Sequence, residues 1–522
     1  MTTLAAMADR PAPAHDLVDA DTATLQRWMA AGTLDSRSLT QAYLDRIAAL
    51  DDAGPRLASV IELNPDALAD AARADAERGS GQRRGPLHGI PVLLKDNIDA
   101  TPMVNSAGSL ALAAHRPATD APLVARLRAA GAVILGKTNL SEWANFRSTR
   151  SVSGWSARGG QTRNPYVLDR SPCGSSAGTG TAIAASLAAV GVGTETDGSI
   201  LCPSAVAGLV GIKPTVGLIS RDGIIPISSS QDTAGPMARS VADAAILLTA
   251  LATPAVQDAG ALSGRPDAAS VDYARHLDAD ALRGARIGVL RDNAVDAQPD
   301  VDAAFERALG LLRDAGATLV DTRITTAGEW DAAELTVMLS EFKVGLEAYL
   351  ASSNAPVRTL DALVAFNATH AEAEMPWFGQ ELFLQAAATT GPGDPAYVAA
   401  RARARHLAGA QGIDAALARD RLDALVVPTM GPAWPIDPLN GDHFTGAGYG
   451  AAAVAGTPSI TVPMGDSHGL PLGMTFMAAA WQEARLVGLA FAFEQRARAR
   501  RAPRYLPTLP DAQGQVTDPA GP

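Results

Sequence analysis

The run Ser171-Pro-Cys-Gly-Ser-Ser-Ala-Gly-Thr-Gly180 leads into an alanine-rich segment, and Gly193-Thr-Glu-Thr-Asp-Gly-Ser-Ile200 follows it after an apolar stretch. Glycines in the first run allow close backbone approach and unusual dihedral angles. Consecutive N–H groups in the second run can form an anion-binding nest, which an oxyanion hole requires. Either run alone is also compatible with a plain connection beside a helix. Together they predict a strand-and-helix scaffold that carries a serine-rich site.

On both sides of this stretch, short aliphatic or β-branched runs alternate with helical runs, which predicts an α/β fold with a parallel or mixed sheet. A helical period over residues 21–50, with Asp35 and Ser36 available as caps, predicts a helical N-terminal layer. The expected strands are residues 90–94, 132–135, 188–192, 286–290, 318–321, 424–427 and 459–462. The expected helices lie near 66–77, 176–189, 240–251, 301–315, 330–351 and 482–499.

The charge balance argues against a nucleic-acid partner. The chain has 522 residues, with 43 Lys plus Arg, 55 Asp plus Glu and a net charge of −12. Such a surface repels phosphate backbones. Residues 1–20 lack the pattern of a secretory signal, and no apolar run of about 18 residues could span a membrane. We therefore expect a cytoplasmic protein without a membrane partner.

The two cysteines, Cys173 and Cys202, are not spaced as metal ligands. Two cysteines in a chain of 522 residues also do not form a disulfide framework. The cysteines thus predict neither a metal site nor a disulfide-stabilised fold.

A serine nucleophile needs a base, and Lys95 is the best candidate. None of the eight histidines lies in a recognisable catalytic or metal-binding motif. Lys95 follows the apolar strand-like run Gly89-Ile-Pro-Val-Leu-Leu94. Burial lowers the pKa of an amine, so a lysine there could accept a proton near neutral pH. A solvated or ion-paired lysine is the alternative.

Three short motifs match those of other protein classes. In each case the neighbouring sequence does not fit the structure or the companion motifs that the class requires. Residues 131–138 match a nucleotide-binding P-loop, but the residues between the glycines are themselves a strand. Residues 174–178 match the nucleophile elbow of α/β-hydrolase esterases, with Ser176 central, but lack the preceding strand. Residues 340–343 match the Ser-x-x-Lys of penicillin-recognising enzymes without the companion motifs.

Five segments, in this order and spacing, together resemble the amidase signature family. They are Leu87-His-Gly-Ile-Pro with Lys95-Asp-Asn, Gly136-Lys-Thr-Asn139, Gly174-Ser-Ser-Ala-Gly178, Gly193-Thr-Glu-Thr-Asp-Gly-Ser-Ile200 and Gly211-Ile-Lys-Pro-Thr215, and Asp232-Thr-Ala-Gly-Pro236 continues the pattern. The resemblance implies one large α/β domain over 21–505, with a central mixed β-sheet covered by helices on both faces. Its signature core is 85–240 and its helical layer 21–80. Residues 1–20 and 506–522 are expected to be irregular.

The resemblance also implies a Ser–cis-Ser–Lys triad. Ser199 matches the nucleophile, Ser175 the cis-serine after Gly174, and Lys95 the general base. Such a triad needs no metal or organic cofactor.

The residues expected to bind the oxyanion and the substrate are Thr196, Asp197, Gly198 and Ser199, together with Ser175. The usual family run reads Gly-Thr-Asp-Thr-Gly-Gly-Ser, so Glu195 and Asp197 depart from it. The local geometry around Asp197 can therefore differ from the family pattern.

Within the family, the chain looks most similar to bacterial peptide amidases, on the Glu-Thr-Asp-Gly-Ser variant with Ser141-Glu-Trp-Ala-Asn145 and Ser153-Gly-Trp-Ser-Ala157. These enzymes hydrolyse the C-terminal carboxamide of peptides and release ammonia. The alternatives are a general aliphatic or aryl amidase and the amidase subunit of an amidotransferase. A nucleotide-binding protein and a catalytically inactive binding module are the interpretations from other classes. The expected partner is a small-molecule or peptide amide, and the expected state is a monomer or small homo-oligomer.

Overall fold

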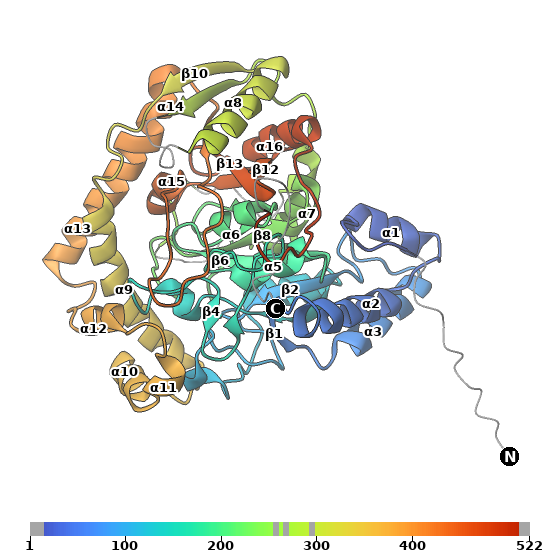
Figure 1. Cartoon of the computed structure of the whole chain (residues 1–522), viewed down its shortest axis with the longest axis horizontal. Helices are drawn as coiled ribbons and strands as arrows, with labels where there is room; N and C mark the ends of the chain where they lie inside the picture. The colour runs from blue at the N-terminus through green and yellow to red at the C-terminus, as the bar shows by residue number, and fades with distance from the viewer. Residues whose placement is uncertain (1–14, 254–259, 265–270, 292–297, 511–522) are drawn as a thin grey trace.

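The computed structural model describes residues 15–253, 260–264, 271–291 and 298–510. Within them, an eleven-stranded sheet runs through the molecule in the order β1-β3-β2-β6-β8-β7-β12-β13-β11-β9-β10 (Figure 1). Its strands are β1 (Val60–Leu63), β2 (Pro91–Lys95), β3 (Val133–Thr138), β6 (Val190–Glu195), β7 (Val210–Lys213), β8 (Thr233–Ala238), β9 (Arg286–Leu290), β10 (Thr318–Thr322), β11 (Ala424–Pro428), β12 (Ser459–Ser467) and β13 (Leu470–Met477). A separate hairpin pairs β4 (Trp155–Ser156) with β5 (Gly160–Gln161).

The sheet is mixed, as predicted. β2 runs parallel to β3 and β6, whereas β8 runs antiparallel to β6 and β7. Every residue of β2, β3 and β6 is buried. Both faces of these central strands are covered by protein, which explains their continuous apolar runs.

Helices cover both faces of the sheet. α5 and α6 pack together over β6 and β7, while α7, α8 and α16 pack against β8 and β12 from the other side. The helices flanking the sheet are α1 (Thr22–Ala30), α2 (Ser36–Ile47), α3 (Ala67–Gly79), α4 (Pro122–Ala129), α5 (Ala177–Ala184), α6 (Leu201–Val206), α7 (Val241–Leu251), α8 (Pro299–Asp314), α14 (Asp414–Asp420), α15 (Gly450–Ala455) and α16 (Glu483–Ala497). The predicted α/β class with a central covered sheet is therefore confirmed.

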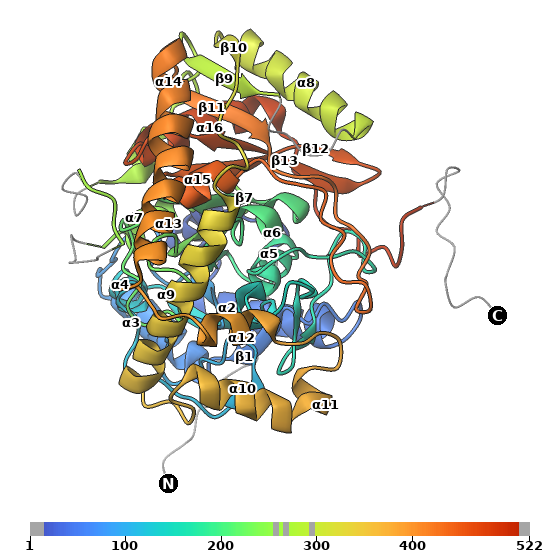
Figure 2. The same ribbon diagram turned by 90° about the vertical axis from the view of Figure 1, so that its left-hand side faces the viewer.

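Two helical groups flank the sheet at opposite sides (Figure 1). The N-terminal layer is α1 to α3, and Asp35 caps α2 by accepting a hydrogen bond from the Ser38 N–H. The other group is α9 (Asp331–Ser352), α10 (Leu360–Thr369), α11 (Ala371–Glu374), α12 (Glu381–Ala387) and α13 (Pro395–Arg405), in which α9 and α13 lie side by side (Figure 2). Phe342 and Phe383 of this group pack in one apolar cluster with Ile225 and Ile227, so the group is anchored beside the site described below.

Several elements differ from the prediction. The helix expected over 176–189 ends at Ala184, because Ser186 adopts a left-handed conformation (φ 54°) that turns the chain into β6. β7 and β8 were not expected from the apolar pattern, since glycine and proline interrupt it. Of the segments expected to be irregular, residues 1–14 and 511–522 lie outside the described residues.

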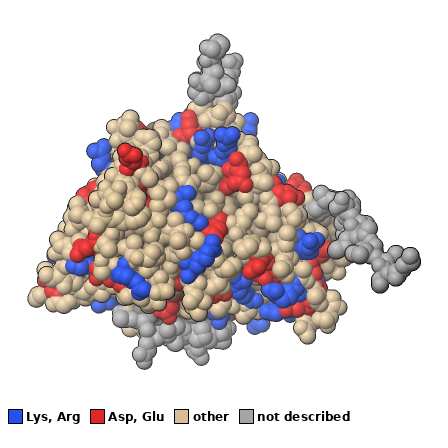
Figure 3. All heavy atoms as spheres, turned by 90° about the horizontal axis from the view of Figure 1, so that it is seen from below, with Lys and Arg blue, Asp and Glu red and all other residues tan. Residues whose placement is uncertain are grey.

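None of the helices in the described part of the chain is both long and apolar enough to cross a membrane. Seen from below, the surface carries basic and acidic side chains side by side rather than one large patch of a single sign (Figure 3).

Candidate active site

Three strand ends meet at one edge of the sheet and enclose a narrow cavity of about 30 Å³. β2 and β6 are parallel and end there, and the antiparallel β8 begins there. The lining of the cavity is partly polar and partly apolar. Its lining consists of Asn97, Ala144, Ser175, Thr194, Glu195, Thr196, Ser199, Arg221, Ile224, Ile225, Pro226, Ile227, Asp232 and Thr233.

Lys95, the last residue of β2, is fully buried beside this cavity. Its Nζ donates hydrogen bonds to Ser175 Oγ (2.7 Å) and Thr194 Oγ1 (2.8 Å). Burial lowers the pKa of Lys95 to about 7, against the opposing effect of the Asp232 and Glu195 carboxylates. Near neutral pH a substantial fraction of this amine is therefore neutral and able to accept a proton.

Ser175 follows a cis peptide bond after Gly174. The next residue, Ser176, donates its backbone N–H to the Ser199 carbonyl (3.1 Å), which holds the two serine-bearing segments together. Ser176 Oγ donates to the Thr194 carbonyl (3.0 Å), and residues 171–175, directly before Ser176, do not form a strand. Ser176 thus fastens the turn to β6 instead of standing exposed as an elbow nucleophile does.

The segment between β6 and α6 carries the predicted nucleophile and oxyanion residues. Thr196 and Ser199 line the cavity with Ser175. Gly198 adopts φ 75°, and its α-carbon faces the Tyr449 ring so closely that a Cβ would clash with it. Asp197 is exposed to solvent and is not among the residues that line the cavity.

Glu195 closes this segment into a tight turn. Its buried carboxylate accepts the backbone N–H groups of Ile200 (2.8 Å) and Leu201 (3.0 Å). Burial raises the pKa of Glu195, and the Lys213 ammonium together with these N–H groups lowers it. A glutamate at this position therefore serves as a cap for the start of α6.

Comparisons with known proteins identify the family. The family model described as Amidase matches residues 38–487. The chain belongs to the amidase signature family. The resemblance predicted from the sequence is confirmed, and the protein is an amide-hydrolysing enzyme.

Solved and curated relatives span nearly the whole amidase. The peptide amidase structure from Stenotrophomonas maltophilia superposes with a TM-score of 0.89 at 59% identity, covering 93% of this chain and 98% of that one. A probable amidase of Arabidopsis thaliana is 39% identical over 91% of this chain and 89% of its own length. In Salinispora arenicola, the A subunit of the glutamyl-tRNA(Gln) amidotransferase is 36% identical over 92% of this chain and 97% of its own length.

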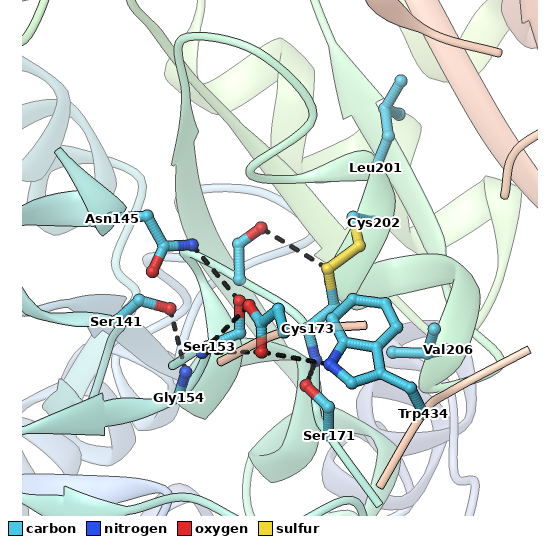
Figure 4. Close-up of a disulfide and its surroundings, with 12 residues drawn as sticks. Ser141, Asn145, Ser153, Gly154, Ser171, Cys173, Leu201, Cys202, Val206 and Trp434 are labelled. Atoms are coloured by element: carbon cyan, nitrogen blue, oxygen red, sulfur yellow. Dashed lines mark hydrogen bonds between the residues drawn. A yellow bond between two sulfur atoms is a disulfide. The ribbon is translucent and has the colours of Figure 1, made fainter. Parts of the chain in front are cut away.

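The amidase also contains a disulfide, Cys173–Cys202, which the cysteine count did not predict (Figure 4). The two residues are 29 positions apart, with Cα atoms 6.0 Å apart, and both are buried. Cys173 lies two residues before Ser175, and Cys202 lies three residues after Ser199. The bond therefore joins the two serine-bearing segments covalently.

Sequence reasoning missed several residues of the amidase cavity. One wall is apolar and is formed by Ala144 and residues 224–227. Asp232 and Arg221 add charge. Asp232 stands in a segment typical of the family, but no spacing rule gave it a role. Residues 224–227 form an isolated apolar run in the sequence, and only the fold brings them to the serines.

The segments that match motifs of other protein classes have structural roles in the amidase. Residues 133–138 form β3, as the argument against a P-loop required. Lys137 from this strand is buried in an ion pair with Asp96 (3.1 Å). Ser340 Oγ donates to the Thr336 carbonyl (2.9 Å) and Lys343 Nζ to the Ala387 carbonyl (2.7 Å). Among the described residues, no group of three or more His, Cys, Asp and Glu side chains could hold a metal ion.

Proposed function

We propose that this amidase hydrolyses the C-terminal carboxamide of peptides to a carboxylate and ammonia, with Ser199 as nucleophile, Ser175 as relay and Lys95 as base. The observation that carries the proposal is the 2.7 Å contact between Lys95 Nζ and Ser175 Oγ, at a buried cavity that Ser199 also lines. The 59% identity to a peptide amidase supports the substrate class.

The mechanism follows from the proton affinity of Lys95. The neutral amine takes the Ser175 proton while Ser175 takes the Ser199 proton, and Ser199 Oγ attacks the carboxamide carbon. Backbone N–H groups of residues 196–199 stabilise the oxyanion, where one lost donor typically costs about 3–4 kcal/mol. The relay returns the proton to the amide nitrogen, the C–N bond breaks and ammonia leaves. Water then hydrolyses the Ser199 ester through the same relay and restores the enzyme.

The lining of the cavity supports a carboxamide substrate with a polar reacting group. The hydroxyl-bearing residues Ser175, Thr196 and Ser199 would contact the polar carboxamide. The wall formed by residues 224–227 would contact the apolar part of the residue that carries the carboxamide.

Ammonia release tests the proposal on a panel of peptide amides, free amino-acid amides and glutamine. We expect the highest kcat/KM on peptide amides, and Ser199→Ala to lose nearly all activity. Ser204→Ala is the matched control, because Ser204 is also buried, in α6, but does not line the cavity. Equal activity of Ser199→Ala and wild type would refute the nucleophile assignment.

The similarity to amidotransferase A subunits supports a second candidate, an amidase subunit that supplies ammonia to a partner. Glutamine would then be the preferred substrate, and partner subunits would co-purify. A monomer or small homo-oligomer active on peptide amides without them would exclude this candidate. Activity that survives dialysis against a chelator would support the predicted independence from metals.

A further inference from the structure

We propose that Asp232 is a positioning residue of this active site: it anchors the oxyanion segment through Thr196 and keeps a negative charge beside Lys95. The inference deepens the proposed function and rests on it. It assigns a role to a carboxylate outside the Lys95–Ser175–Ser199 triad.

The register of the sheet brings Asp232 to the site. β6 and β8 are antiparallel, with Glu195 opposite Thr233. The residue after Glu195 and the residue before Thr233 are therefore neighbours across the strands. Accordingly, Thr196 Oγ1 donates a 2.6 Å hydrogen bond to Asp232 Oδ1.

The second carboxylate oxygen is held by the chain segment that includes residues 224–227. Asp232 Oδ2 accepts the backbone N–H groups of Ile227 (2.8 Å) and Ser228 (2.9 Å). One buried carboxylate thus ties the apolar wall to the first residue of the oxyanion segment. Because Thr196 is three residues before Ser199, a shift at Thr196 would move the N–H donors that the oxyanion needs.

The loop that carries Asp232 is itself fixed from α9. Glu341 accepts hydrogen bonds from the hydroxyls of Ser228 and Ser230 (each 2.6 Å) and from the Ser230 N–H (2.8 Å). Gln231 Nε2 donates to Glu334 Oε1 (2.8 Å). The position of Asp232 is therefore set by two carboxylates of the same helix.

Asp232 also acts on the proposed base. Two carboxylates, Asp232 directly before β8 and Glu195 at the end of β6, raise the pKa of Lys95 against the effect of burial. Burial raises the pKa of Asp232 itself to about 6, while Thr196, the Arg221 guanidinium and the two backbone N–H groups lower it. The ionised carboxylate stabilises the ammonium form of Lys95. Removing its charge should make Lys95 easier to deprotonate.

Asp232→Asn separates these effects, because asparagine has the same shape without the charge. Its carbonyl can still accept the Ile227 and Ser228 N–H groups, and its NH2 can donate to Thr196 Oγ1. We expect the acid-side midpoint of kcat/KM on a peptide amide to move about half to one unit below that of wild type. Asp243→Asn is the matched control, because Asp243 is a buried carboxylate of α7 that accepts the Thr22 N–H (3.0 Å) outside the cavity. The kcat/KM midpoint of this variant should equal that of wild type.

Thr196→Val tests the anchoring role with the charge left in place. We expect kcat on the alkaline plateau, where Asp232 is ionised, to fall about tenfold or more. If Asp232→Asn fails to fold, Asp232→Glu replaces it as the test. Glutamate keeps the charge but displaces the hydrogen bond to Thr196, so kcat should fall as in Thr196→Val. An unchanged or raised midpoint in Asp232→Asn, or full kcat in Thr196→Val, overturns the inference. If wild type releases no ammonia from peptide amides, the proposed function fails instead.

Discussion

Lys95 Nζ and Ser175 Oγ lie 2.7 Å apart where the end of β2 meets the turn before α5. The contact joins residues 80 positions apart and is buried. Two more hydrogen bonds from Nζ, to the hydroxyl and the carbonyl of Thr194, fix the direction of the amine. The contact therefore places an amine of lowered pKa against the hydroxyl that would pass the proton on.

Replacing Lys95 by arginine should abolish amidase activity almost as completely as replacing it by alanine. A guanidinium stays protonated, so it cannot accept the Ser175 proton. We expect kcat/KM to fall by at least about 10³-fold in both variants, as for loss of a nucleophile-activating base. Lys343→Arg is the control, because Lys343 on α9 does not line the cavity and donates to main-chain carbonyls of residues 387 and 389. Substantial turnover by Lys95→Arg would rule out Lys95 as the general base.

The pH profile of kcat/KM should rise through about pH 7. The active form holds a neutral Lys95, and the pKa of this amine is about 7 because it is buried. Activity should therefore be low when the amine is charged, below the midpoint, and reach a plateau above it. A profile measured from pH 5 to 9 with a peptide amide checks this. Activity that still rises tenfold per pH unit at pH 9, as expected for a lysine with the ordinary pKa of 10.5, would contradict it.

Comparison with Lys95→Met should show how the buried lysine changes the free energy of unfolding with pH. The folded pKa of about 7 lies below the ordinary 10.5, so between these values the unfolded chain binds a proton that the native protein lacks. Wild type should therefore gain stability relative to Lys95→Met as pH rises through this window. Urea unfolding at pH 6.5, 8 and 9.5 measures the difference. A constant difference would mean that Lys95 titrates normally.

The strands that could be predicted are those whose burial requires a continuous run of apolar residues. β2 and β3 are buried on both faces, so their apolar runs are visible without knowledge of their partners. β8, Thr233-Ala-Gly-Pro-Met-Ala238, has no such run, and its strand conformation depends on pairing with β6 and β7.

The residues of the candidate site could be selected from the sequence only through the family motifs. Family motifs contain Lys95, Ser175 and Ser199, and all three lie at one edge of the sheet. The contact of Thr196 with Asp232 follows from strand register rather than from spacing. The pairing of Cys173 with Cys202 likewise depends on how the two segments approach in space, which a count of cysteines cannot show.

Replacing Cys173 and Cys202 together by alanine should destabilise the amidase and lower its activity. A cross-link over 29 positions restricts the unfolded chain by about 3–4 kcal/mol in the loop-entropy model. The same bond holds the segments of Ser175 and Ser199 together, so kcat should fall more than KM rises. Urea unfolding and steady-state kinetics measure both effects. Thiol titration of the unfolded, unreduced wild type should find no free thiol, and two free thiols would contradict the disulfide and favour the reducing cytoplasm predicted from the sequence.

Replacing Gly198 by alanine should inactivate the amidase with little loss of overall stability. Gly198 has φ 75°, which L-residues rarely adopt, and a Cβ there would clash with the Tyr449 ring. Relief of the clash has to move the segment from Thr196 to Ser199, and displaced N–H donors should reduce kcat about 10²-fold or more. Gly32→Ala is the matched control, since Gly32 has φ 69° but open space around its α-carbon and lies just after α1. If both variants keep wild-type kcat, the close approach of Gly198 to Tyr449 does not shape the site. If both lose activity equally, backbone strain alone is the cause, and only a selective loss in Gly198→Ala supports the role of this contact.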